Sequence, residues 1–277
     1  MRTRIVTSVF AVCTAAALAA CRPVHSGEEP NFSALSYKNL IPNESYSPSA
    51  APLAPGTALD LSGDVPRPGA YFNYQSCTAA WSFTLADART IAVTASHCGK
   101  PGDKVWAGTA DGDFTYPAEP IGEVIYSDFY SDQSHDLDVA FIEITGSAEY
   151  FVPGRLDNSV ATSLAHLPHE VCKLGRVTEE TCGSLSHDAE IAQLNSQDLQ
   201  RDSLAARAYV CSTNGDSGGP VYGEVEGRQT IVGVVSGTTQ HLEEGHTCQS
   251  TKTDMELSFT LATDIQLLAK EVLGPMA

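Results

Sequence analysis

Three short segments of the sequence carry side chains that together could perform acyl transfer. His97 and Asp138 each adjoin an apolar run, and Ser217 lies in the glycine-rich turn Asn214–Pro220. Acyl transfer needs a nucleophile, a base that takes its proton and a carboxylate that orients the base. It also needs backbone N–H donors for the oxyanion, which a glycine-rich turn can present without interference from Cβ atoms. The chain offers one candidate for each part.

The elements that must position these side chains are predicted to be short strands. Apolar runs of four to eight residues, rich in β-branched and aromatic side chains, alternate with turn residues. Examples are Trp81–Leu85, Thr90–Thr94, Gly122–Tyr126, Val139–Ile144 and Thr230–Val235. Many such strands without helices between them predict an all-β sandwich or barrels. Near the end, apolar residues three and four apart predict a helix between Leu261 and Val272.

Two of the segments resemble motifs of the trypsin/chymotrypsin-like serine endopeptidases. Thr94–Cys98 is similar to the Thr-Ala-x-His-Cys sequence of that family, and Gly215–Pro220 to its Gly-Asp-Ser-Gly-Gly-Pro sequence. The resemblance extends over about Tyr71–Gly274. It implies two six-stranded antiparallel β-barrels with the active site between them, in a peptidase domain that we place at residues 69–277 and that includes the terminal helix.

The resemblance also implies roles for individual residues. Ser217 would be the nucleophile, His97 the general base and Asp138 its orienting partner. The backbone N–H groups of Gly215 and Ser217 would form the oxyanion hole, and peptide bonds would be hydrolysed through an acyl-enzyme. Five further positions match substrate-binding residues of the family: Cys211, Asn214, Ser236, Gly237 and Thr238.

Asp136 competes with Asp138 for the orienting role. A carboxylate that enters the buried strand beginning at Val139 is better placed to pair with His97. We therefore favour Asp138, and we expect His135 to lie in a solvated loop.

Six cysteines remain once Cys13 and Cys21 of the N-terminal segment are set aside. An even number in an exported chain indicates disulfides, although the count leaves their pairing open. Glu170–Thr178, followed by Cys182 and a glycine, is similar to the bacterial streptogrisin and alpha-lytic branch of the family. That resemblance implies the pairs Cys77–Cys98, Cys172–Cys182 and Cys211–Cys248.

The sequence gives little support to a metal site, and we expect no cofactor. It contains no Cys-x-x-Cys spacing. A proline between His166 and His169 prevents the helix that would bring them together as ligands. Asp111–Asp113 is more typical of a polar turn than of a calcium loop.

The sequence departs from the family before the first barrel. No Ile-Val-Gly-Gly segment precedes Cys77. The sequence therefore offers no liberated N-terminal ammonium to pair with Asp216, and it leaves the route of activation open.

The residue six positions before the nucleophile lies at the base of the primary specificity pocket in this family. Here it is Cys211, which carries no charge when bonded to Cys248, and burying a substrate cation without a partner is costly. Thr238 stands where wide pockets have a glycine and would narrow the mouth. We therefore predict cleavage after small or medium apolar residues. Asp254 and Glu256 are the acids that could instead attract Lys or Arg.

Residues 1–20 predict a signal peptide, because a positively charged start precedes an apolar run too short to span a membrane. Leu18–Cys21 resembles the bacterial lipobox, which favours a lipoprotein anchored at Cys21 over simple secretion. We expect it to face the periplasm or the cell surface. Residues 21–68, rich in Pro, Ser and Asn, predict a disordered tether or a short pro-segment.

The overall charge limits the partners of the protein. A net charge of -18 argues against nucleic acids, because few cations are present to neutralise phosphates. No second apolar run approaches the length of a spanning helix, so we expect membrane contact only through the lipid. We expect the substrates to be proteins or peptides and the enzyme to be a monomer.

Two other functions are compatible with parts of this pattern. A catalytically inactive trypsin-like homologue could act as a cell-surface binding protein, but it would be expected to lack His97 or Ser217, and both are present. An esterase of the α/β-hydrolase type would need alternating strands and helices, which the sequence does not show.

Overall fold

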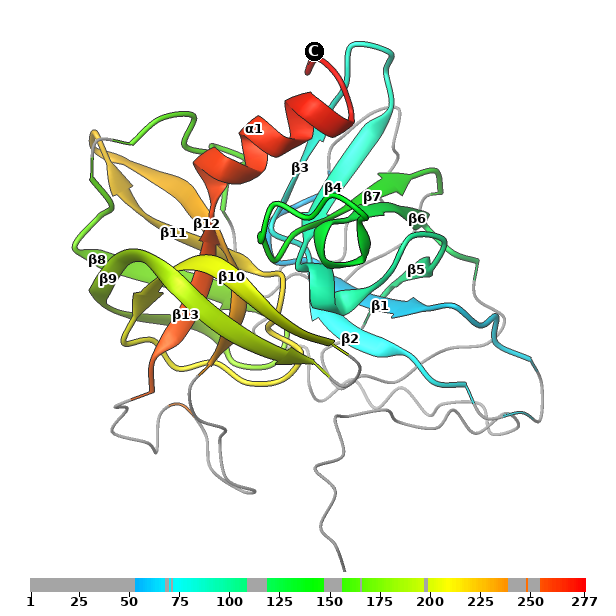
Figure 1. The fold of residues 1–277 in the computed structure, drawn as a ribbon, viewed down its shortest axis with the longest axis horizontal. Coiled ribbons are helices and arrows are strands. Elements are labelled where there is room, and N and C mark those ends of the chain that lie inside the picture. Colours follow the sequence, from blue (N-terminus) through cyan, green and yellow to red (C-terminus); the bar gives the residue numbers. More distant parts are fainter. Residues whose placement is uncertain are drawn as a thin grey trace, which may run out of the picture.

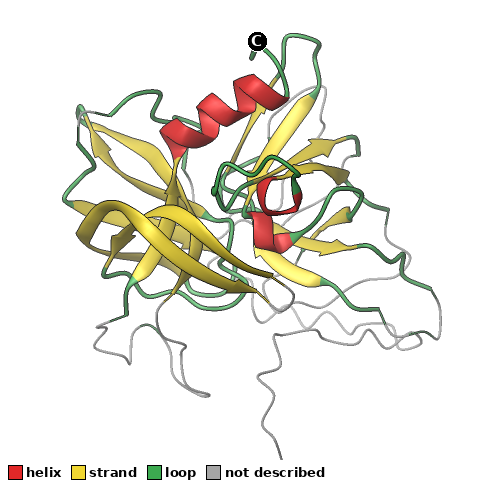
Figure 2. Cartoon of the chain, in the orientation of Figure 1, coloured by secondary structure: helices red, strands yellow, loops and turns green. Residues whose placement is uncertain are grey.

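The structure is a computed structural model that describes residues 53–67, 70, 72–108, 119–146, 156–164, 166–196, 199–238, 248 and 255–277. These residues form two antiparallel sheets and one terminal helix (Figures 1 and 2), which confirms the predicted all-β two-barrel class. None of the described helices is long and apolar enough to cross a membrane. The predicted signal peptide, the lipidation site Cys21 and most of the tether lie outside the described residues.

The N-terminal sheet has seven strands in the order β2-β1-β5-β6-β7-β4-β3. They are β1 (Ala58–Ser62), β2 (Gln75–Thr78), β3 (Trp81–Thr84), β4 (Thr90–Thr94), β5 (Lys104–Ala107), β6 (Gly122–Ser127) and β7 (Ala140–Ile144), with short 3-10 turns η2 (Ser96–Cys98) and η3 (Asp128–Tyr130) after β4 and β6.

The two edge strands of this sheet, β2 and β3, are joined by Ala79 and Ala80. The N–H of Ala79 donates to Thr57 O beside β1, and that of Ala80 donates to Val93 O on β4, both at 2.8 Å. The chain therefore changes its pairing partner between adjacent residues. β2 and β3 act as one bent strand that closes the sheet, which gives the equivalent of the expected six-stranded barrel.

β1 lies before the domain boundary that we placed at residue 69. Leu59 and Leu61 are buried in the core, and β1 pairs with both β2 and β5. The prediction of a tether over residues 21–68 is therefore wrong for residues 53–67, which are part of the fold. The alternation of leucines in Ala58–Ser62 was the available signal, but proline- and glycine-rich stretches on both sides obscured it.

The C-terminal sheet is a closed barrel in the order β10-β13-β12-β11-β8-β9. Its strands are β8 (Glu170–Gly175), β9 (Glu179–Ser196), β10 (Leu199–Ala208), β11 (Pro220–Val225), β12 (Arg228–Thr238) and β13 (Leu257–Leu261). Alternate side chains point inward, and Val171, Val221 and Phe259 are among those that fill the interior. The N–H of Leu204 on β10 donates to Asp136 O at 2.8 Å, which joins this barrel to a loop of the other.

The predicted helix is confirmed as α1 (Ala262–Val272), which follows β13 directly. Ile265 and Leu268 pack into a core that contains strands of both sheets. In Figure 1 the helix runs from the C-terminal barrel toward the edge of the N-terminal sheet. There the last residue, Ala277, donates its N–H to Thr84 O on β3 at 2.9 Å. The terminal segment therefore fastens one barrel to the other.

Candidate active site

His97 and Asp138 form a hydrogen-bonded pair. His97 lies in η2, immediately after β4, and Asp138 lies just before β7, the strand paired with β4. The ring Nδ1 of His97 is 2.8 Å from Asp138 Oδ2, and the backbone N–H of His97 donates to Asp138 Oδ1 at 3.1 Å. Asp138 is fully buried, whereas 17% of the His97 side chain is exposed. With Nδ1 engaged by the carboxylate, Nε2 is the ring atom that can accept a proton.

The environment of His97 shifts its affinity for a proton. Burial lowers the pKa of His97, but the charge of Asp138 and the hydrogen bond to it more than offset burial, so the net pKa is raised. Asp136 makes no comparable pair, because it is exposed and its backbone is left-handed, with φ of 57°. The geometry thus favours Asp138 over Asp136 as the partner of His97.

A buried carboxylate that the sequence did not single out shapes the loop before Asp138. Asp128 is fully buried and accepts hydrogen bonds from the Tyr126 hydroxyl, the Ser134 hydroxyl and the backbone N–H groups of His135 and Leu137. The ring Nδ1 of His135 is also 3.1 Å from Asp128 Oδ1. His135 is partly exposed, as expected for a loop, but it is tied to the loop by Asp128 rather than simply solvated.

Ser217 lies in a turn that packs against the segment carrying His97. The Thr78 N–H donates to Ser217 O at 2.8 Å, and Cys98 Sγ lies 3.9 Å from the same oxygen. Gly218 has a positive φ of 82°, and a Cβ there would lie 2.0 Å from Thr94 Oγ1. Only glycine allows so close an approach. The turn is therefore seated directly on the first barrel, beside η2.

Asp216 organises the same turn from within. Its fully buried carboxylate accepts hydrogen bonds from the backbone N–H groups of Val177, Thr178 and Thr213 and from the hydroxyl of Ser212. These donors satisfy the hydrogen-bonding capacity of the buried carboxylate oxygens. It ties the turn of Ser217 to the segment between β8 and β9.

The counter-charge of Asp216 is a buried lysine. Lys173 Nζ lies 3.3 Å from Asp216 Oδ2, and neither side chain is exposed. The ammonium also donates to Glu179 O at 2.8 Å and to the Thr178 hydroxyl. Burial lowers the pKa of Lys173, and the charge of Asp216 opposes that shift only in part. The sequence offers no new N-terminal ammonium to pair with Asp216. The ammonium of Lys173 supplies that positive charge instead.

The family of the chain can now be stated. The sequence model of the family described as Trypsin matches residues 70–253. The chain belongs to the trypsin family. Its fold resembles that of Thermobifida fusca protease A, at 18% identity over 81% of this chain and 97% of that one, with a TM-score of 0.50. It also resembles a glutamic acid specific serine protease, at 19% identity over 81% of this chain and all of that one, with a TM-score of 0.51.

Membership of the trypsin family confirms the predicted family and classes the chain with the serine endopeptidases. No curated protein matches the chain at a significant level.

Of the residues expected at the specificity pocket of this trypsin-family chain, Cys211 is buried and bonded to Cys248. The backbone N–H of Ser212 points to Sδ of the buried Met255 at 3.3 Å, which places an apolar side chain beside the disulfide position. Glu256 is engaged by the Ser186 hydroxyl at 2.6 Å and by Arg207 at 3.3 Å.

The other expected pocket residues differ in exposure. Ser236 is buried on β12, Gly237 and Thr238 are partly exposed at the end of that strand, and Asn214 is exposed. Asp254 lies outside the described residues.

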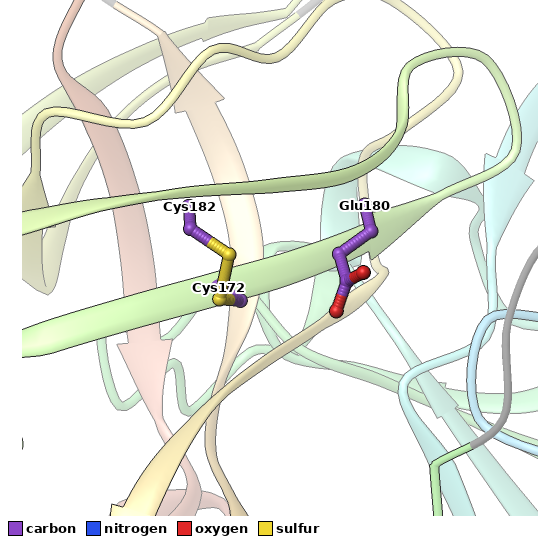
Figure 3. Close-up of side chains that lie close together, drawn as sticks. All are labelled: Cys172, Glu180 and Cys182. Atoms are coloured by element: carbon purple, nitrogen blue, oxygen red, sulfur yellow. A yellow bond between two sulfur atoms is a disulfide. The ribbon is translucent and has the colours of Figure 1, made fainter.

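The six cysteines of the peptidase domain form Cys77–Cys98, Cys172–Cys182 and Cys211–Cys248. These are the pairs that the resemblance implies. Figure 3 shows Glu180 beside Cys172 and Cys182, the one group in the described part of the chain with the composition of a metal site. Both sulfurs are used in the disulfide, so they are not thiolate ligands, and Glu180 accepts the Tyr222 hydroxyl.

Proposed function

We propose that this trypsin-family chain is an active, exported serine endopeptidase that uses Ser217, His97 and Asp138 as its catalytic triad. The observation that carries the proposal is the buried carboxylate of Asp138, bound through both oxygens to His97. This contact fixes the tautomer that an accepting Nε2 requires. Ser217 O accepts the Thr78 N–H at 2.8 Å and lies 3.9 Å from Cys98 Sγ, so the Ser217 turn lies beside the η2 segment that carries His97.

The reaction follows from this arrangement. Ser217 Oγ attacks the carbonyl carbon of the scissile peptide bond while His97 Nε2 takes the hydroxyl proton. The backbone N–H groups of Gly215 and Ser217 stabilise the tetrahedral oxyanion. His97 then gives the proton to the leaving amine, and water hydrolyses the acyl-enzyme by the same route in reverse.

The Lys173–Asp216 pair supports a site that is competent without a newly formed N-terminus. In the absence of a cation, a buried Asp216 carboxylate would be costly and the turn of Ser217 would lose its support. Because the cation belongs to the same barrel, removal of an N-terminal segment is not needed to form this ion pair.

The surroundings of Cys211 support cleavage after small or medium apolar residues. Cys211 is bonded and uncharged, and Sδ of the buried Met255 lies 3.3 Å from the backbone nitrogen of the next residue, Ser212. Glu256 is already bound by Arg207, so it is poorly placed to receive a substrate cation. Thr238 would restrict the mouth of the pocket. Backbone groups of Ser236–Thr238 and the Asn214 side chain would contact the peptide.

Export is the part of the proposal that rests on the sequence and the disulfides. Three disulfides favour an oxidising compartment. We further propose a monomeric lipoprotein anchored at Cys21. Cys21→Ser should then release the protein from membranes and abolish its acylation, as measured by fractionation and mass spectrometry. An unmodified mature N-terminus beyond Cys21 in the natural protein would contradict the anchor.

Covalent labelling tests the triad and separates an enzyme from an inactive binding homologue. A fluorophosphonate should modify wild-type protein at Ser217, as mapped by mass spectrometry, and His97→Ala should prevent the reaction. Peptidase activity should fall by several orders of magnitude in Ser217→Ala, because the triad acts as a unit. Labelling elsewhere, or unchanged activity in Ser217→Ala, would reject the assignment. Folded wild-type protein that neither reacts nor cleaves would indicate the inactive homologue.

A further inference from the structure

We propose that Thr78 is a positioning residue of the oxyanion hole, whose hydroxyl fixes the peptide unit between the two oxyanion donors. The inference rests on the proposed function, because the N–H groups of Gly215 and Ser217 are oxyanion donors only if Ser217 is the nucleophile. It concerns how those donors are held in place.

Thr78 contacts the Ser217 turn at two points. It ends β2, next to Cys77, and it is fully buried. Its backbone N–H donates to Ser217 O at 2.8 Å, and its hydroxyl donates to Gly215 O at 2.8 Å. A single residue of the first barrel thus binds the carbonyl groups of both residues whose N–H groups would face the oxyanion.

The bond to Gly215 O matters because of where that carbonyl lies. The two oxyanion donors are separated by one peptide unit, formed by Gly215 O and the N–H of Asp216. Gly215 has a φ of 99°, and glycine permits rotations of the flanking peptides that other residues resist. The Thr78 hydroxyl holds one end of this unit, and Thr213 O accepts the Asp216 N–H at 3.0 Å at the other end. Rotation of the unit would break both bonds.

The hydroxyl of Thr78 is itself oriented by a neighbour. It accepts the backbone N–H of Arg176 at 3.1 Å, which leaves its own hydrogen directed at Gly215 O. The guanidinium of Arg176 is buried in the first barrel, where it donates to Leu59 O at 2.7 Å and pairs with Asp60. The position of the oxyanion donors is therefore set by a chain of contacts that begins at β1.

Three variants test the proposal. Thr78→Val keeps the shape and the backbone N–H but removes the hydroxyl, whereas Thr78→Ser keeps the hydroxyl. Thr57→Val is the matched control, because Thr57 is also fully buried and its hydroxyl also donates to a backbone carbonyl, that of Ala54, at 2.6 Å. The Thr57 hydroxyl bonds to Ala54 O rather than to the Ser217 turn. Kinetics are measured on the peptide anilide that wild-type enzyme cleaves best, and folding is followed by thermal unfolding.

Removing one oxyanion donor typically costs about 10²–10³ in kcat, so a displaced donor should cost about 10- to 100-fold in Thr78→Val. KM should stay within about twofold, because ground-state binding does not use the oxyanion. A peptidyl boronic acid, which mimics the tetrahedral state, should weaken by about the same factor as kcat/KM falls. Thr78→Ser should retain most of kcat, and Thr57→Val should lower the unfolding temperature without lowering kcat.

Several results would overturn the inference. They are an unchanged kcat in Thr78→Val, an equal loss in Thr57→Val, or a loss in Thr78→Ser as large as in Thr78→Val. If Thr78→Val does not fold, Thr78→Ala and Thr78→Ser replace it as the compared pair, and equal kcat values in those two contradict the proposal. Inactive wild-type protein that fluorophosphonate does not label would instead reject the proposed function.

Discussion

Lys173 Nζ lies 3.3 Å from Asp216 Oδ2, and neither side chain reaches solvent. The lysine stands on β8 and the aspartate precedes the candidate nucleophile, so the ion pair links the wall of the C-terminal barrel to the Ser217 turn. Taking both charges out of water is costly unless each is paired and hydrogen-bonded, and both are. The pair therefore behaves as one unit on which the turn depends.

Lys173→Met should destabilise the protein strongly and reduce activity. Removing one member of a buried pair leaves the other charge uncompensated, at a typical cost of about 3–5 kcal/mol. Denaturant unfolding gives the free energy, and kcat/KM on a peptide anilide gives the activity. Lys104→Met is the control, because the Lys104–Glu123 pair is partly exposed and should contribute less than about 1 kcal/mol. Equal losses in the two variants would show that burial of the pair is not the cause.

Activity should decrease as the pH falls, because His97 must be neutral to accept the proton of Ser217. Since the pKa of His97 is raised, the decrease in kcat/KM should centre above the ordinary histidine value of about 6.5. Asp138→Asn should lower kcat by about 10⁴-fold, because the amide favours the wrong tautomer. Asp136→Asn should have little effect. A large loss in Asp136→Asn with activity retained in Asp138→Asn would reverse the assignment of the two carboxylates.

His135 should make the stability of the Asp138 loop depend on pH. The hydrogen bond to Asp128 raises the pKa of His135, and the charges of Asp128 and Glu271 add to the effect while burial opposes it. A raised pKa in the folded state means that the stabilisation is fully present below the unfolded pKa and is lost as the pH rises through the folded value. His135→Gln should therefore lose more unfolding free energy at about pH 5 than at about pH 8.5.

The effect at His135 should be small, because 36% of its side chain is exposed and solvent screens the contact. His166→Gln, on an exposed residue elsewhere, serves as the comparison for the general effect of losing a histidine. A loss of stability in His135→Gln that is independent of pH would show that the protonated ring does not contribute.

Sequence analysis could select the candidate triad residues because each lies in or beside a short recognisable motif. His97 and Ser217 each lie among neighbours whose types are constrained by the same chemistry, and Asp138 precedes a recognisable strand. The contacts that support these residues are not marked by any motif in the sequence. Thr78 and Gly215 are 137 residues apart in the chain, and a threonine at the end of a strand has no unusual sequence context. Asp128 likewise could not be selected from the sequence, because its role depends on the fold that buries it beneath the loop whose N–H groups it accepts.

Buried charge pairs are equally difficult to predict from the sequence. The sequence analysis could ask what would neutralise Asp216, but it could not select Lys173, because a lysine on a β-strand is usually exposed. Only the inward register of β8, in which Cys172 faces Cys182 and Lys173 faces the interior, decides the matter. The domain boundary failed for a related reason, since β1 is a short strand whose stability comes from β2 and β5 rather than from its own sequence.

Specificity gives the last prediction. A peptide library should show cleavage mainly after small or medium apolar residues, because Cys211 is uncharged and Met255 lies beside it. Thr238→Gly should widen the mouth of the pocket and shift the preference toward larger apolar residues, measured as the ratio of kcat/KM for Phe and Ala substrates. A pocket of this kind discriminates by about 10- to 200-fold per methylene at most, so the shift should be of that order.

Glu256→Gln separates the two ways in which this specificity prediction could be wrong. Glu256 is bound by Arg207 and Ser186, so its replacement should leave the library profile unchanged. A wild-type profile dominated by Lys or Arg would contradict the prediction. If Glu256→Gln then abolished that preference, the carboxylate must leave Arg207 to meet the substrate. If the preference persisted, Asp254 would be the acid to replace next, because an uncharged Cys211 cannot balance a buried substrate cation.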